Sequence, residues 1–208
     1  MISGLYAITQ ETDNTAVLLA SVTAALRGGA GVVQYRDKSN NVARQHEQAS
    51  ELLLLCRQFN VPLIINDSLR LADLIGADGV HIGRDDGAIH AARIVLGADK
   101  IIGVSCYQSV VLAEKAQAAG ADYVAFGSFF PSITKPNAPL ADMALLHLAT
   151  QAIHVPIVAI GGITLANADS LINAGADAVA VISALFDNED VAATARQFAD
   201  LFITATED

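Results

Sequence analysis

The chain contains few residues of the kinds that mark disulfide-rich, membrane-spanning or nucleic-acid-binding proteins. It has two cysteines, five prolines and no tryptophan, and 12 basic residues stand against 22 acidic ones in a total of 208. Two cysteines make no disulfide framework, and neither belongs to a Cys-x-x-Cys metal pair. A formal net charge of -10 would repel both a phosphate backbone and an anionic membrane. We therefore expect no nucleic acid and no membrane among the partners.

Long apolar segments and linker-like segments are also missing. Apolar runs such as Leu52 to Cys56 are too short to span a bilayer, and Met1 to Leu5 hold no basic region followed by an apolar block. No Pro/Ser-rich or charge-dense stretch marks a place where the chain divides. The sequence predicts one soluble, cytoplasmic domain over residues 1–208.

The residues that are abundant are small and branched apolar ones. The chain is 53% hydrophobic, only 16% charged and 5% aromatic, so its core must consist mainly of Val, Ile, Leu and Ala. Such a core is typical of a parallel sheet that is covered on both faces.

A phrase that begins Gly-Ala-Asp occurs three times, at Gly76, Gly120 and Gly175. Each copy follows an amphipathic stretch and predicts a helix end on glycine, a tight turn and a buried strand. Helical spacing is clear over Val42–Phe59, and a last helix is expected from about Asp190 to Ala205. Eight strands are predicted: Gly4–Thr9, Gly31–Arg36, Pro62–Asn66, Gly79–Ile82, Lys100–Val104, Tyr123–Gly127, Pro156–Gly161 and Ala178–Ser183.

Eight strands that alternate with helices favour a (β/α)8 TIM barrel in a single domain. The 208 residues shared by eight units leave 26 for each, enough for a strand, two turns and a helix. An open doubly wound sheet is the alternative, but no Gly-x-Gly-x-x-Gly turn follows the first strand. In either architecture the functional residues are expected just after the carboxyl ends of the strands.

Two of these strand ends carry charged groups. Gln34, Arg36 and Lys38 occupy alternate positions after strand two, so they share one side and could clamp a polyphosphate. Asp67 and Asp86 follow strands three and four, which lie about 5 Å apart, so both could approach one Mg²⁺. Capping of the following helices is the other reading of these aspartates.

The remaining strand ends offer hydroxyls, a lysine and paired glycines. Ser105 could hydrogen-bond a substrate, and Lys135 could neutralise developing negative charge from a longer loop over residues 127–136. Gly161-Gly162 after strand seven is typical of a site where backbone amides bind a phosphate. His81 lies within a strand and is interpreted as a hydrogen-bonded core residue outside the site. Cys56 and Cys106 are interpreted as packing residues.

Taken together, these motifs resemble the thiamine phosphate synthase family along essentially the whole chain. The segments that carry the resemblance are residues 34–38, 64–67, 79–86, 102–105, 127–135, 159–163 and 180–183. Enzymes of that family join an aminomethylpyrimidine diphosphate to a thiazole phosphate and release pyrophosphate, together with carbon dioxide when the thiazole is a carboxylate. Thiazole tautomerases of the same fold and non-catalytic, ligand-sensing barrels are the alternatives, and retention of the charged clamp argues against the tautomerase.

The resemblance implies a role for particular residues. Arg36, Lys38 and Lys135 would be catalytic, stabilising the departing pyrophosphate. The pyrimidine diphosphate would contact Gln34, Tyr35, Arg36, Asp37, Lys38, Asn66, Ser105 and Lys135. The thiazole phosphate would contact Ser132, Ile133, Thr134, Gly162, Ile182 and Ser183. Asp67 and Asp86 would bind one Mg²⁺ per subunit.

Three positions depart from the family's usual residues, and the oligomeric state stays open. The family usually has Thr at Ser132, Gln at Arg84 and Arg at Ser68. Ser132 keeps a hydroxyl, whereas Arg84 adds charge beside the expected metal site. The expected partners are the two small-molecule substrates, and formation of a homo-oligomer is not decided by the sequence.

Overall fold

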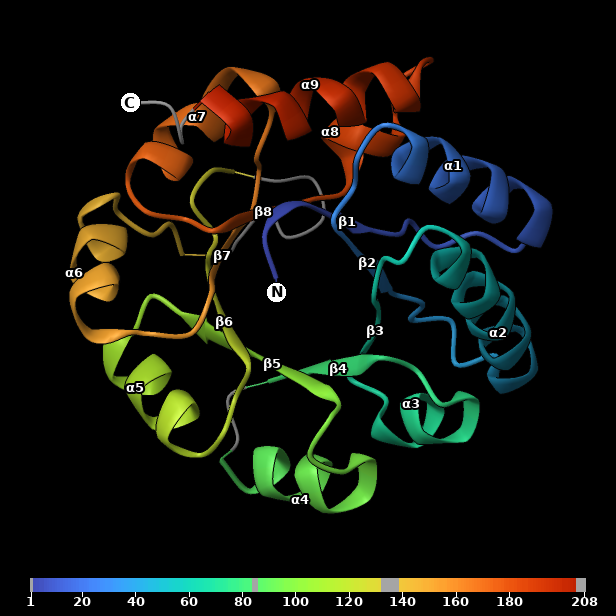
Figure 1. The fold of residues 1–208 in the computed structure, drawn as a ribbon, viewed down its shortest axis with the longest axis horizontal. Helices are drawn as coiled ribbons and strands as arrows, with labels where there is room; N and C mark the ends of the chain where they lie inside the picture. The colour runs from blue at the N-terminus through green and yellow to red at the C-terminus, as the bar shows by residue number, and fades with distance from the viewer. Residues whose placement is uncertain (1, 84–85, 132–138, 205–208) are drawn as a thin grey trace.

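A computed structural model describes residues 2–83, 86–131 and 139–204, except the side chains of residues 86, 87 and 204 (Figure 1). Its strands form one closed barrel in which each strand pairs in parallel with its neighbours in the chain, and β8 pairs with β1. The strands are β1 Gly4–Ile8, β2 Val32–Tyr35, β3 Leu63–Asn66, β4 Gly79–Ile82, β5 Ile101–Tyr107, β6 Tyr123–Gly127, β7 Ile157–Ile160 and β8 Ala178–Val181. The predicted (β/α)8 barrel is confirmed.

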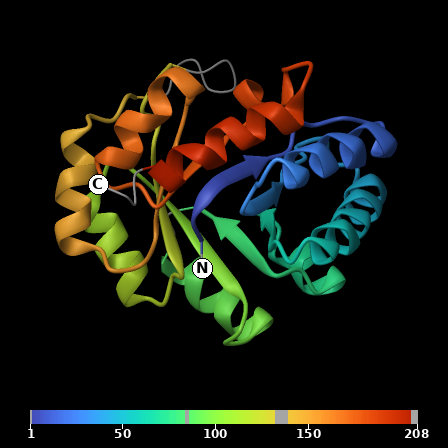
Figure 2. The ribbon, with the colours of Figure 1, turned by 45° about the horizontal axis from the view of Figure 1, so that its top comes forward.

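Helices surround the strands on the outside. They are α1 Thr15–Arg27, α2 Val42–Gln58, α3 Leu69–Ile75, α4 Asp86–Leu96, α5 Val110–Ala118, α6 Ala144–Ala152, α7 Leu165–Asn173, α8 Ser183–Phe186 and α9 Val191–Thr204. Figure 2 shows α9 in red between α7 and α1, so the last helix closes the outer ring. No helix in the described part of the chain is long and apolar enough to cross a membrane.

Two strands end at least two residues away from their predicted ends. β5 runs on to Tyr107, so Ser105 lies inside the strand. β8 stops at Val181, because Ile182 has φ -117° and ψ -90°, and the short helix α8 begins at Ser183. The described residues therefore contain one more helix than the eight expected.

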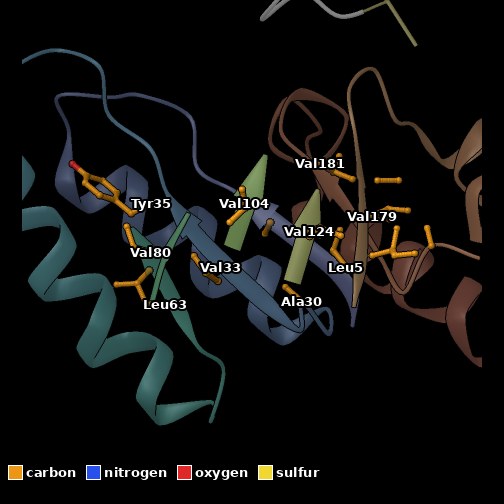
Figure 3. Close-up of a cluster of buried hydrophobic side chains, with 14 of the residues drawn as sticks. Leu5, Ala30, Val33, Tyr35, Leu63, Val80, Val104, Val124, Val179 and Val181 are labelled. Atoms are coloured by element: carbon orange, nitrogen blue, oxygen red, sulfur yellow. The ribbon is translucent and has the colours of Figure 1, made fainter. Parts of the chain in front are cut away.

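Side chains alternate between two buried layers. Along β1, Leu5 and Ala7 face the helices, whereas Tyr6 and Ile8 face the barrel interior. Figure 3 shows outward residues of several strands, including Val33, Leu63 and Val124, in the cluster between strands and helices. Both cysteines belong to this outer cluster and are fully buried, which confirms their interpretation as packing residues.

The repeated Gly-Ala-Asp phrase joins neighbouring strands at the amino-terminal end of the barrel. In each copy the aspartate precedes a strand, and its carboxylate accepts a hydrogen bond from a backbone N–H at the start of the strand before it. The pairs are Asp78 with Leu63 N at 2.9 Å, Asp122 with Ile102 N at 2.7 Å and Asp177 with Ile157 N at 2.7 Å. The repeat is therefore structural and lies at the end of the barrel opposite the strands' carboxyl ends.

Candidate active site

A cavity of about 590 Å³ lies at the carboxyl ends of the strands. Its lining includes Ser105 inside β5 and four residues that follow or end strands, namely Arg36, Asn66, Gly162 and Ile182. All five were predicted as site residues, and Gln34 and Ser183 line the cavity as well. The barrel therefore brings together residues from strands distant in the sequence, as the prediction required.

The floor of the cavity is a chain of hydrogen bonds through the barrel interior. Tyr6 and Tyr123 are almost completely buried, and their hydroxyl oxygens lie 2.7 Å apart. Gln34 Nε2 donates to the Tyr6 hydroxyl at 2.9 Å. On the other side, the Tyr123 hydroxyl lies 2.8 Å from His81 Nδ1, and His81 Nε2 lies 2.8 Å from Ser105 Oγ. Five strands thus contribute one polar side chain each.

The glycine at position 103 leaves space for the Tyr123 ring in this floor. The Tyr123 ring lies where a Cβ on Gly103 would be, since that atom would stand 1.9 Å from the ring. The ring also meets Tyr6 edge to face and stacks with His81. Burial raises the pKa of both tyrosines, so both hydroxyls stay protonated at neutral pH.

Beside the cavity-lining residues Arg36 and Asn66, the loops after β2 and β3 bring a cation next to a carboxylate, although neither Lys38 nor Asp67 itself lines the cavity. Lys38 Nζ donates to Asp67 Oδ2 at 2.5 Å, and Asn66 Nδ2 donates to the same oxygen at 2.9 Å. The Lys38 and Asp67 side chains are each about half exposed, so a ligand can reach both. The backbone N–H of Arg36 donates to Thr9 Oγ1 at 3.0 Å, which fixes the start of this loop.

Two further residues predicted to bind the pyrimidine diphosphate have side chains that face away from the cavity. Tyr35 faces the helices because it alternates with Gln34, and its hydroxyl donates to Gln48 Oε1 at 2.9 Å. The Asp37 carboxylate, 1% exposed, accepts from Arg44 Nε at 3.0 Å and from Ser39 N at 2.7 Å. Both residues brace the loop that carries Arg36 and Lys38 and do not line the cavity.

The Asp67 backbone is in the left-handed region, with φ 59°, and its N–H donates to the carbonyl of His81. Asp67 does not cap α3, because Ser68 Oγ accepts from Leu71 N in that position. The cap reading is therefore excluded for Asp67, whose carboxylate pairs with Lys38 and Asn66 instead. Asp86 begins α4, but its side chain lies outside the described part of the structure. Within that part, no three His, Cys, Asp or Glu residues gather closely enough to hold a metal.

The opposite side of the cavity is built from backbone that approaches closely. Gly161 and Gly162 have φ of 104° and 62°, and a Cβ on Gly162 would lie 2.3 Å from the carbonyl oxygen of Pro131. Ile182 and Ser183, which follow the neighbouring strand β8, line the cavity as well. Five residues named from the sequence fall outside the described residues: Arg84, Ser132, Ile133, Thr134 and Lys135.

Sequence reasoning missed three residues of the floor. His81 is hydrogen-bonded, as expected, but it also lines the cavity, and so do Tyr6 and Tyr123. One signal was available in the sequence. Alternation of side chains along each strand directs these three polar residues into the barrel interior and not toward the helices. What the sequence alone does not reveal is that β1, β4 and β6 bring them into contact.

Comparison with known proteins agrees with this geometry. The family described as thiamine monophosphate synthase matches residues 5–185. A thiamine-phosphate synthase of Thiobacillus denitrificans is 62% identical over 205 residues, covering 99% of this chain and 97% of that protein. One of Methylobacillus flagellatus is 57% identical over 201 residues, covering 97% and 96%.

A solved structure supports the same assignment. Thiamine phosphate pyrophosphorylase from Pyrococcus furiosus superposes with a TM-score of 0.86 at 32% identity, over 97% of this chain and 96% of that one. Because the match extends over nearly the whole length of both chains, the resemblance seen in the sequence is confirmed, and the chain belongs to the thiamine monophosphate synthase family.

Proposed function

We propose that the cavity holds an aminomethylpyrimidine diphosphate beside a thiazole phosphate and joins them, forming thiamine phosphate and releasing pyrophosphate. Family membership makes the chain a transferase of the thiamine-phosphate synthase type. The observation that carries the proposal for this site is the pairing of Lys38 with Asp67 in the loops after β2 and β3, which also bring Arg36 and Asn66 to the cavity. A thiazole carboxylate would also lose carbon dioxide.

Each side of the cavity would bind one of the two substrates. Arg36, Lys38 and Asn66 would hold the diphosphate by charge-assisted hydrogen bonds, with Lys135 as a further predicted cation. The backbone at Gly162, Ile182 and Ser183 would hold the thiazole phosphate, because glycine lets the main chain approach an anion closely. Ser132, Ile133 and Thr134 remain predicted contacts on this side.

The donor set on the diphosphate side fits Mg²⁺. Asp67 offers hard carboxylate oxygens beside the cavity, and Asp86 is the second predicted ligand. Magnesium is usually held by one or two carboxylates, substrate phosphates and water, so this small set suffices. Bound there, Mg²⁺ would neutralise charge on the departing pyrophosphate. The ammonium of Lys38 would then move from Asp67 to a phosphate oxygen.

The reaction needs no protein nucleophile. The pyrimidine methylene loses pyrophosphate as the electron-rich ring supports the positive charge, and the thiazole nitrogen then attacks. Arg36 and Lys38 stabilise the leaving group, and the apolar inward residues Ile8 and Val158 exclude water from the cation. Cys106 faces the helices and burial raises the pKa of its thiol to about 12, so it does not act as a nucleophile.

A thiazole tautomerase and a ligand-sensing barrel are the competing functions. Neither needs a diphosphate clamp, and the pairing of Lys38 with Asp67 beside Arg36 favours the synthase. The cytoplasmic location stays a prediction, and the oligomeric state stays open.

The direct experiment incubates the full chain with both substrates and Mg²⁺ and measures thiamine phosphate and pyrophosphate. Equal amounts of the two products are expected, and binding without product would support a sensing barrel. Asp67→Asn is the sharpest variant, since Asn tolerates the left-handed backbone at this position. We expect Mg²⁺-dependent turnover to fall roughly 100-fold or more. Asp169→Asn, at an exposed position of α7, is the matched control. Full activity in Asp67→Asn would refute the metal assignment.

A further inference from the structure

The hydrogen-bonded chain at the cavity floor has a direction. It runs from Gln34 on β2 through Tyr6 on β1, Tyr123 on β6 and His81 on β4 to Ser105 on β5, with every donor–acceptor distance between 2.7 and 2.9 Å. We call these five side chains the floor relay. Its two ends, Gln34 and Ser105, both line the cavity.

The amide of Gln34 sets the direction. Gln34 Nε2 can only donate, so the Tyr6 oxygen accepts from it. Tyr6 as a whole residue is 1% exposed, and the other partner of its hydroxyl is the Tyr123 hydroxyl. If Tyr123 donated to Tyr6, two donors would meet at one oxygen and the buried Tyr6 O–H would have no acceptor, which is costly. Tyr6 therefore donates to Tyr123.

The same logic continues to the other end. Since its oxygen accepts from Tyr6, the Tyr123 O–H is directed at His81 Nδ1, which must be unprotonated to accept it. A neutral imidazole then carries its proton on Nε2, and that N–H donates to Ser105 Oγ. We infer that the floor relay holds His81 as the neutral Nε2–H tautomer, so that the Ser105 hydroxyl faces the substrate as a hydrogen-bond donor.

Burial of the two tyrosines supports this arrangement. Desolvation raises the pKa of Tyr6 and of Tyr123 above the usual value of 10.0, so neither loses the proton that it passes along the relay. A protonated imidazolium would donate from both nitrogens and would leave one of the two tyrosine O–H groups without an acceptor.

The direction of the hydrogen bonds in the floor relay determines which donor and acceptor groups face the substrate ring, and therefore which ring can bind. Ser105 offers a donor at one end, and Gln34 keeps its carbonyl oxygen as an acceptor at the other. This step rests on the proposed function: an aminopyrimidine has ring nitrogens that accept and an amino group that donates, whereas its 4-oxo counterpart places an acceptor where the amino group stood. His81, Tyr123 and Tyr6 are thus positioning residues for substrate selection.

The first test needs no activity. Nitrogen-15 NMR of the full chain labelled at histidine, with the His81 signals assigned by their loss in His81→Gln, identifies the protonated ring nitrogen. We expect a proton on Nε2 and none on Nδ1. A proton on Nδ1, alone or with one on Nε2, would overturn the inference.

A variant tests the cause of that tautomer. Tyr123→Phe removes the donor to Nδ1, so we expect a mixture of tautomers. Tyr35→Phe removes a buried hydroxyl on the helix side of the barrel and should leave the tautomer unchanged. An unchanged His81 spectrum in folded Tyr123→Phe would contradict the relay. If that variant does not fold, the wild-type spectrum still decides.

The second test is a double-mutant cycle on the KM for the pyrimidine diphosphate. Ser105→Ala and Tyr123→Phe should each raise KM roughly fivefold, the effect of one hydrogen bond. Because Tyr123 acts through Ser105, the double variant should also show roughly fivefold, whereas independent effects would multiply to roughly 25-fold and refute the coupling. Absence of any thiamine phosphate from wild-type protein would refute the proposed function alone, and the NMR result would still judge the relay.

Discussion

The Asp37 carboxylate lies between β2 and α2, where it accepts hydrogen bonds from Ser39 N and from two nitrogens of Arg44. Burial would raise its pKa, but the hydrogen bonds from Ser39 and the charge of Arg44 outweigh burial and hold the pKa below the usual 3.8. Lys38 N donates to Glu11, which also contacts Arg44. These contacts fix the loop whose cations face the cavity.

We predict that Asp37→Asn weakens diphosphate binding although residue 37 does not touch the cavity. The neutral amide cannot form the ion pair with Arg44, so the loop loosens, and KM for the pyrimidine diphosphate should rise more than kcat falls. The free energy of unfolding should fall by about 1–2 kcal/mol. Steady-state kinetics and denaturant unfolding measure the two effects, and an unchanged KM would contradict the bracing role.

The lowered pKa also predicts a pH dependence with a definite sign. The ionised Asp37 contributes stability that is fully present above its unfolded pKa of about 3.8 and is lost as the pH falls below it. Wild-type protein should therefore lose more stability than Asp37→Asn on acidification from neutral pH to below that value. If the free energies of unfolding of the two proteins fell equally across this pH range, the lowered pKa of Asp37 would be contradicted.

At this scale the alternation of side chains was enough to predict that Gln34 and Arg36 share a side. It also implied that Tyr35 and Asp37 face the other way, and the resemblance to the family, which covered the whole string, obscured that point. The partner of Asp37 could not be predicted, because Arg44 meets it only through the packing of α2 against β2.

At the scale of elements, the Gly-Ala-Asp repeat joins neighbouring strands. The aspartate of each copy stands just before β4, β6 or β8 and hydrogen-bonds the start of β3, β5 or β7. Asp177 accepts from Ile157 N, and Asp122 accepts both from Ile102 N and from Arg93, which also donates to the carbonyl of Gly120. These contacts lie at the end of the barrel away from the cavity, so they concern stability and not catalysis.

We predict that Asp177→Ala lowers the free energy of unfolding by about 1–3 kcal/mol, since it leaves Ile157 N without its acceptor. Asp177→Asn keeps a carbonyl oxygen and should lose less. Asp169→Ala, on the exposed side of α7, should stay within about 0.5 kcal/mol of wild type. Denaturant unfolding gives the three values, and kcat and KM should not change. A loss of activity in folded Asp177→Ala would show that the repeat also serves the site.

The sequence predicted every strand to within a few residues, because the apolar runs and the glycines at helix ends mark the junctions. It did not predict α8, since Ala178 to Ile182 is an uninterrupted apolar run and only the backbone turn at Ile182 ends the strand. A local pattern cannot reveal such a turn.

At the scale of the whole molecule, closure of the barrel explains both the success and the limit of prediction. The even count of units predicted closure, and closure alone brings the carboxyl ends of β2, β3, β5, β7 and β8 around one cavity. The floor relay depends on which inward side chains meet across the interior. That depends on the stagger of the strands, which the sequence does not state.

The double-layered core also predicts how the molecule responds to alkali. Burial raises the pKa of the Cys56 thiol to about 12, with a smaller contribution from Asp78, and burial raises that of Cys106 to about 12. An unfolded thiol ionises near 9.0, the ordinary value. The neutral thiols therefore contribute stability that is complete below the unfolded pKa and is lost as the pH rises from there toward the folded pKa.

We expect the free energy of unfolding to fall above about pH 9, by up to about 1.4 kcal/mol per pH unit for each thiol. Denaturant unfolding at a series of pH values measures this slope. The Cys56→Ala/Cys106→Ala variant should be less stable at neutral pH, because it leaves cavities in the outer core, yet its stability should fall less steeply in alkali. Since Tyr6 and Tyr123 are retained, some alkaline loss should persist. Identical slopes for the two proteins would mean that the thiols ionise in the folded barrel as readily as in the unfolded chain, which their complete burial opposes.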